Sequence, residues 1–124
     1  MTDLGFLSLG LTGAGTALTA RLAYVFLRDP ARGMALTTHR PEALPKVMAD
    51  RYVAFTALAL FSLIYGDFVV IAATFSTFAY MAFHDALIYA RAGHPTSKHW
   101  IAGFGAALVA VLALATIVQT GAAF

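Results

Sequence analysis

Five polar side chains could do chemistry within otherwise apolar stretches of this sequence: Arg51, His84, Asp85, Tyr89 and His99. Ionisable groups inside a segment of membrane-spanning length are costly there, and they usually belong to a ligand site, a proton path or an ion pair. Arginine and aspartate can hold or polarise the polar head of a small molecule, and histidine can act as a general acid or base. These five residues are therefore our ligand-binding candidates, and no catalytic role is assigned to any of them.

Arg51 and Asp85 are placed by their distances from Gly66, a predicted turn. Arg51 lies 15 residues before Gly66 and Asp85 lies 19 residues after it. At a rise of 1.5 Å per residue, the two side chains differ in depth by only about 6 Å in a helical hairpin. An ion pair between them is therefore expected. Such a pair could simply pin the hairpin by neutralising both charges, or it could polarise a ligand.

Two faces of the segment around His84 compete for the protein interior. Tyr80 and His84 share one face, whereas Asp85 and Tyr89 share another, each pair at four-residue spacing. Because a carboxylate is hard to leave in lipid, we expect Asp85 and Tyr89 to face inward. His84 is then expected at a seam between helices, bonded to a backbone carbonyl or a lipid head group.

The spacing of the histidines gives little support to a metal or cofactor site. His94 and His99 are five residues apart across Pro95, so they do not form the pair on one helical face that metal sites use. His84 and His99 could face each other from two helices, but nothing in the sequence requires a haem there. Cysteine is absent, which excludes disulfides and thiolate chemistry. We expect no metal site and name no cofactor.

Four apolar stretches must position these side chains. The chain of 124 residues is 60% apolar and only 11% charged, whereas a soluble domain carries about 25% charged residues. About 20 residues are needed for a helix to cross a bilayer, and we predict membrane-spanning helices over 4–27, 47–66, 68–91 and 98–122. Gly66 should end the second helix and Asp67 should cap the third. The connection 28–46 fits an irregular or short interfacial helical segment.

Every lysine and arginine lies in or beside two of the predicted loops. They are Arg21, Arg28, Arg32, Arg40, Lys46, Arg51, Arg91 and Lys98. The positive-inside rule then puts loops 28–46 and 91–98 in the cytoplasm and both termini outside. The formal net charge of +2 is therefore read as a signal of topology, and a nucleic-acid partner is not expected.

The predicted fold is all-α: a single transmembrane domain over 1–124, built as an antiparallel four-helix bundle. Stripes of small residues support close helix packing. They comprise Gly10, Gly13, Ala14 and Ala17 in the first helix, and Gly103, Ala106, Ala107, Ala110 and Ala113 in the last. The stripes could pack within the bundle, which we favour, or form a dimer interface.

Several of these features together resemble the DoxX-like small four-helix membrane proteins of bacteria. They are Arg51 opening the second helix, the hairpin Tyr65-Gly66-Asp67, the helix ending from His84 and Asp85 to Arg91 and Gly93, and His99. The resemblance covers about residues 48–110. It implies a four-helix bundle in the bacterial inner (plasma) membrane in which Arg51, Asp85 and His99 form a shared polar site. Some DoxX-like relatives are associated with quinone-linked redox complexes.

Two functions fit these patterns. In the first, a lipophilic ligand such as a quinone or isoprenoid enters from the lipid bilayer, and its polar head meets the candidate residues on the cytoplasmic side. That protein could be a binder or a small enzyme. In the alternative, the chain is an accessory or structural subunit of a homo-oligomer or a larger membrane complex, and the polar residues only hold its helices together.

Overall fold

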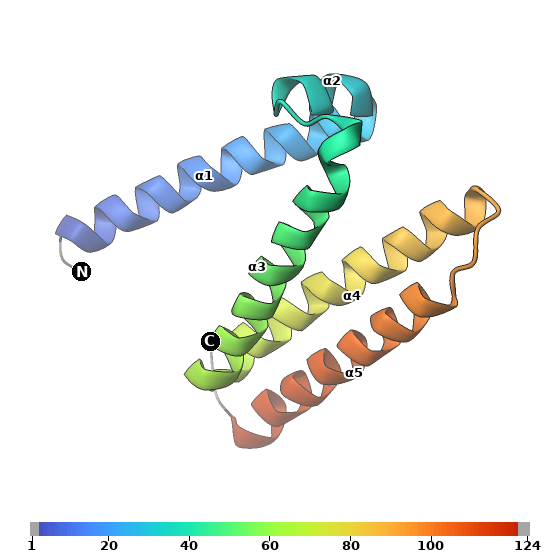
Figure 1. The fold of residues 1–124 in the computed structure, drawn as a ribbon. Coiled ribbons are helices and arrows are strands. Elements are labelled where there is room, and N and C mark those ends of the chain that lie inside the picture. The colour runs from blue at the N-terminus through green and yellow to red at the C-terminus, as the bar shows by residue number, and fades with distance from the viewer. Residues whose placement is uncertain (1–2, 122–124) are drawn as a thin grey trace. The chain divides into compact units, whose positions relative to one another are not determined.

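The computed structural model describes residues 3–121 and, within its first helix, the side chains of Leu7, Leu11, Ala14 and residues 17–28. Each described element is helical (Figure 1). The elements are α1 (Asp3–Arg28), α2 (Pro30–Leu36), the 3-10 helix η1 (Pro41–Ala43), α3 (Leu44–Tyr65), α4 (Phe68–Arg91) and α5 (Ser97–Thr120). The predicted all-helical fold is confirmed. The chain divides into two compact units, Met1–Ala49 and Asp50–Phe124, and the boundary falls inside α3.

Three helical segments in the described part of the chain are long and apolar enough to cross a membrane: Pro41–Tyr65, Phe68–Arg91 and Ser97–Thr120. They indicate a membrane protein. Helix α1 is not among the three, because its glycines, threonines and Arg21 lower its hydropathy. The expected four-helix transmembrane bundle is therefore confirmed only in part: the described residues form five α-helices, and three segments can span a bilayer.

Basic residues gather at the same ends of the three membrane-spanning segments whether or not α1 also crosses the membrane. Successive spans cross a bilayer in opposite directions, so the start of α3, the end of α4 and the start of α5 lie on one side. Lys46 and Arg51 lie near the start of α3, Arg91 ends α4, and Lys98 begins α5. Basic residues therefore lie at or near each of the three helix ends that would share one side of a bilayer.

A capped elbow joins α1 to α2 within the first unit. The Asp29 carboxylate accepts the backbone N–H of Arg32 at 3.0 Å, and Pro30 occupies the first turn of α2. A Cβ atom on Gly33 would lie 2.6 Å from the ring of Phe26, so this close approach of the two helices requires glycine. The short helical segment expected within 28–46 is present.

The turn between α3 and α4 follows from two local signals in the sequence. Gly66 adopts a φ of +73°, in the left-handed region that glycine enters without strain. Asp67 caps α4, since its carboxylate accepts the backbone N–H groups of Val69 at 2.8 Å and Val70 at 3.1 Å. The predicted helix stop and the predicted cap are both confirmed.

Helices α4 and α5 pack as an antiparallel hairpin along a seam of small side chains (Figure 1). The seam is buried at Ala72, Ala79 and Ala86 of α4 and at Gly103, Ala110, Ala113 and Ile117 of α5. Positions 72, 79 and 86 are seven residues apart, as are 103, 110 and 117. A repeat of seven keeps one face of each helix towards its partner, and small residues along it let the backbones approach closely.

The two predicted stripes of small residues have different outcomes. The stripe of the last helix does pack inside the molecule, because Gly103, Ala110 and Ala113 are buried. In α1, Ala14 and Ala17 are exposed. The packing of Gly10 and Gly13 lies outside the described residues.

Candidate functional site at the α4–α5 turn

The end of α4 brings His94 back against Tyr89. Gly93 has a φ of +74°, and the backbone N–H of His94 donates to the carbonyl of Tyr89 at 2.9 Å, while that of Gly93 donates to Ala90 at 3.1 Å. These bonds form a Schellman motif, a common ending of α-helices. The ring centroids of Tyr89 and His94 are consequently 5.9 Å apart, with an angle of 62° between the ring planes.

The first turn of α5 supplies a second ring to the same tyrosine. His99 stacks on Tyr89 with a centroid separation of 4.8 Å and an interplanar angle of 15°. Helix α5 begins after Thr96, whose backbone carbonyl accepts the N–H groups of His99 and Trp100 at 3.0 and 3.1 Å. Tyr89 therefore lies between two histidines that come from the turn and from the next helix.

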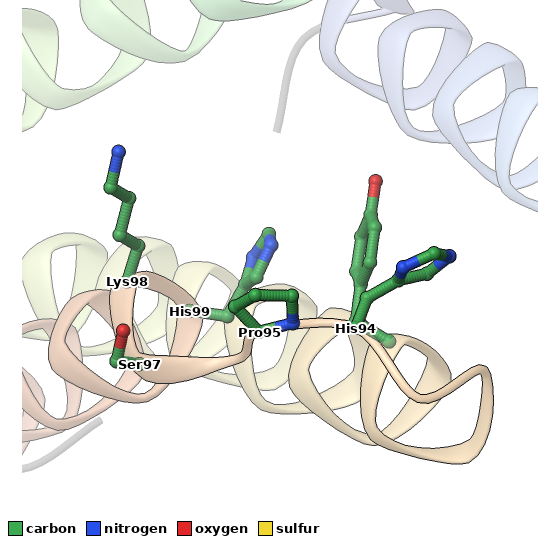
Figure 2. A pocket seen from close by; sticks show the side chains of 6 residues that line it. His94, Pro95, Ser97, Lys98 and His99 are labelled. Atoms are coloured by element: carbon green, nitrogen blue, oxygen red, sulfur yellow. The ribbon is translucent and has the colours of Figure 1, made fainter.

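An open depression of about 420 Å³ lies beside these rings. It is lined by Tyr89, His94, Pro95, Ser97, Lys98 and His99. Figure 2 shows Lys98 and His99 projecting to the same side of the hairpin, with His94 farther along the turn. The lining has hydroxyl, imidazole and ammonium groups but no carboxylate, so it offers hydrogen-bond donors and positive charge to a ligand.

The expected ion pair between Arg51 and Asp85 is not formed in the described part of the chain, where Arg51 is exposed and Asp85 half-buried. Near the Gly66 turn, the small residues Ser62 and Thr74 allow α3 and α4 to meet, with their hydroxyl oxygens 3.0 Å apart. Two turns farther along α3, larger side chains fill the space between the helices. The rings of Phe55 and Phe78 are 5.5 Å apart there. The helices separate in this direction (Figure 1), and depth alone does not bring the charges together.

The inward face of α4 also differs from the expected one. Its buried line passes through Ala79 and Ala86, with Asp85 to one side of that line and His84 nearly opposite it. Both side chains are half-buried, and Tyr89 is 43% exposed. His84 stacks on Tyr80, one turn earlier, with centroids 5.7 Å apart and an interplanar angle of 10°. Small alanines take the interior of the α4–α5 seam, which lets the two backbones approach closely.

Of the five candidates, the structure brings together Tyr89 and His99. Four further lining residues, His94, Pro95, Ser97 and Lys98, were not among the candidates. A signal for His94 was present in the sequence, since a histidine directly after a helix-ending glycine lies against the last turn of that helix. Among residues 3–121, no group of three or more His, Cys, Asp or Glu side chains is placed to hold a metal ion.

Gly93 controls the position of His94, so its replacement should loosen the turn. A Cβ atom on Gly93 would have nothing within 4 Å, and the cost of Gly93→Ala is therefore conformational, about 1 kcal/mol for a left-handed non-glycine residue. The free energy of unfolding in detergent micelles measures it. Gly105→Ala, where a Cβ atom also meets nothing within 4 Å but the backbone is helical, should cost nothing. Equal losses in the two variants would contradict the role of Gly93.

No family model, curated protein or solved structure matches this chain.

Proposed function

We propose that this protein is a multi-pass protein of the bacterial inner membrane that binds the polar head of a lipophilic ligand at the cytoplasmic end of α4 and α5. The DoxX-like resemblance belongs to the same proposal. The observation that carries it is the stacked Tyr89–His99 pair beside a depression lined by hydrogen-bond donors without a carboxylate. Ligand sites commonly combine apolar or aromatic walls with a few convergent polar groups.

The place of the depression supports an amphiphilic ligand. It lies at the tip of two helices that can span the bilayer, where the polar head of a lipid-soluble molecule meets water. Apolar side chains continue along α5 below it, and Ile101 and Phe104 are exposed. A hydrocarbon chain could follow this surface while its head occupies the depression, because in lipid the exposed apolar surface has no penalty.

Gentle purification from native membranes tests the proposal. We expect a lipophilic molecule, detected by mass spectrometry and an absorption spectrum, at a nearly stoichiometric level with the wild-type protein. Tyr89→Leu combined with His99→Leu removes the stacked pair and should lower the bound amount about 10-fold, the effect of losing one or two hydrogen bonds and a stacking surface.

The chain contains its own matched control for this experiment. Tyr80 and His84 also form a stacked tyrosine–histidine pair, but neither residue lines the depression. Tyr80→Leu combined with His84→Leu makes the same chemical change and should retain the ligand. Loss of ligand from this control alone would place the site in the middle of α4, and equal retention in both variants would remove the site from the hairpin.

The alternative function, an accessory subunit of a membrane complex, has one observation in its favour. Ser62 is the one buried residue of α3, and most other side chains of that helix are exposed and open to lipid or to another protein. The same purification separates the two functions. Other polypeptides in a fixed ratio, without a small molecule, would favour the accessory subunit.

A further inference from the structure

We propose that the α4–α5 depression recognises a phosphate group. This inference rests on the proposed function, because it names the polar head that the same site would bind. A phosphate carries a charge of −1.5 to −2 near neutral pH and presents strong acceptor oxygens. It needs several donors and no neighbouring carboxylate. The depression meets both requirements, as the following features of its lining indicate.

The side chains in the lining are all potential donors, apart from Pro95. Lys98 contributes an ammonium group, which acts as a point charge towards phosphate. The imidazoles of His94 and His99 and the hydroxyls of Tyr89 and Ser97 can each donate a hydrogen bond. A quinone, which has neutral carbonyl oxygens, needs only one or two donors and gains little from an ammonium group. The composition of the site therefore favours an anion with several oxygens.

The C-terminus of α4 and the N-terminus of α5 both lie at the depression, but they differ in how many of their backbone polar groups are already hydrogen-bonded. Three carbonyls of the last turn of α4 are occupied, because Ile88, Tyr89 and Ala90 accept the N–H groups of Ala92, His94 and Gly93. The N-terminus of α5 carries no side-chain cap from Thr96. Its first amide groups and the positive end of its dipole therefore add to the field of Lys98. The backbone of α5 therefore adds hydrogen-bond donors and positive potential to those of the side chains.

A phosphate could reach this site from two sources, as the head group of a membrane amphiphile or as free phosphate in solution. Titrations of the protein in dodecyl maltoside micelles, which contain no phosphate, distinguish the two sources. Three probes are used: farnesyl phosphate, farnesol and inorganic phosphate. Trp100, the single tryptophan of the chain, follows His99 directly, and its fluorescence reports binding.

Farnesyl phosphate should bind at least about 10-fold more tightly than farnesol, since hydrogen bonds to charged groups are the strong ones. Lys98→Gln and His99→Gln should each reduce this preference about 5- to 10-fold. The matched controls are Lys46→Gln, which alters the other lysine of the chain, and His39→Gln. Neither residue lines the depression, and both variants should keep the preference.

The titration with inorganic phosphate shows whether the site binds a lipid head group or free phosphate. Binding at millimolar concentration with the same dependence on Lys98 would identify free phosphate, and binding of farnesyl phosphate alone would identify a lipid head group. Equal affinities for farnesol and farnesyl phosphate, both lost in the Tyr89→Leu and His99→Leu double variant, would overturn the phosphate inference and leave the proposed function standing. If Lys98→Gln left the preference unchanged, or if no probe bound, the inference would be wrong. Circular dichroism of each variant verifies that the helices are retained.

Discussion

Replacing Gly103 with valine should destabilise the α4–α5 hairpin by about 3 kcal/mol, the upper range for overpacking a close contact. A Cβ atom at this position would lie 2.5 Å from two atoms of the Phe83 ring. That ring cannot easily turn away, because it contacts Trp100 at 5.6 Å and Phe104 at 5.2 Å between centroids. The helices would have to separate along their seam of small residues.

Gly105→Val is the matched control for this variant. It makes the same change two residues further along α5, where a Cβ atom has nothing within 4 Å. Both substitutions change helix propensity equally, so the difference between them isolates the clash with Phe83. The free energy of unfolding, obtained by titrating sodium dodecyl sulfate into dodecyl maltoside micelles and following Trp100 fluorescence, measures that difference. Equal stabilities would show that α4 and α5 do not meet at Gly103.

Ser62→Leu should release α3 from α4 at a cost of about 2–3 kcal/mol, from overpacking and a lost hydrogen bond. Ser62 is fully buried at 0% exposure, and its hydroxyl donates to the carbonyl of Leu58 at 2.9 Å. The hydroxyl of the buried Thr74 must then be the donor in the 3.0 Å contact between the two side chains. Leucine would both overfill the space and remove the acceptor of Thr74.

The size of the substituent should decide the effect at Ser62. Ser62→Ala removes the same hydroxyl without overfilling and should cost only about 0.6 kcal/mol, the average for hydrogen bonds between membrane helices. Thr56→Leu, at an exposed position of α3 with a similar bond to the carbonyl of Tyr52, should cost little. Unfolding titrations compare the three variants. A loss for Ser62→Ala as large as that for Ser62→Leu would contradict an overpacking mechanism.

Cysteine crosslinking tests the same contact directly, because the native chain has no cysteine. Ser62→Cys together with Thr74→Cys should form a disulfide on mild oxidation, since the native oxygens are 3.0 Å apart. Thr56→Cys together with Thr74→Cys should not. A crosslink in the second pair alone would mean that the register of α3 and α4 is shifted.

Local chemistry made the turns predictable. The stop at Gly66 and the cap at Asp67 depend on backbone conformation and on amide groups within three residues, and both are present as expected. The small residues of α5 also indicated a packing face, and Gly103 and Ala110 are buried in it. The matching face of α4 could have been found in the same way, from alanines at positions 72, 79 and 86.

The candidate site was predictable only in part. Tyr89 and His99 come together because each lies within one turn of a helix end joined by a short loop, so their approach is almost a local property. Arg51 and Asp85 are joined through a longer path. Their pairing needed α3 and α4 to stay close along their whole length, and the rings of Phe55 and Phe78 occupy the space between the helices. Two residues at the same depth in neighbouring helices can still be far apart if the helices diverge.

The sequence by itself predicted an all-helical chain with segments that can span a membrane, although it predicted four such segments where the described residues have three. These properties follow from hydropathy and from hydrogen bonds between near neighbours, which act without knowledge of the fold. The tertiary structure decided which polar groups on different helices meet when a long stretch of chain separates them. Contacts between helices depend on the sizes of the side chains at each crossing: small residues close the α4–α5 seam, whereas the rings of Phe55 and Phe78 meet between α3 and α4. Arg51 and Asp85 form no ion pair in the described part of the chain.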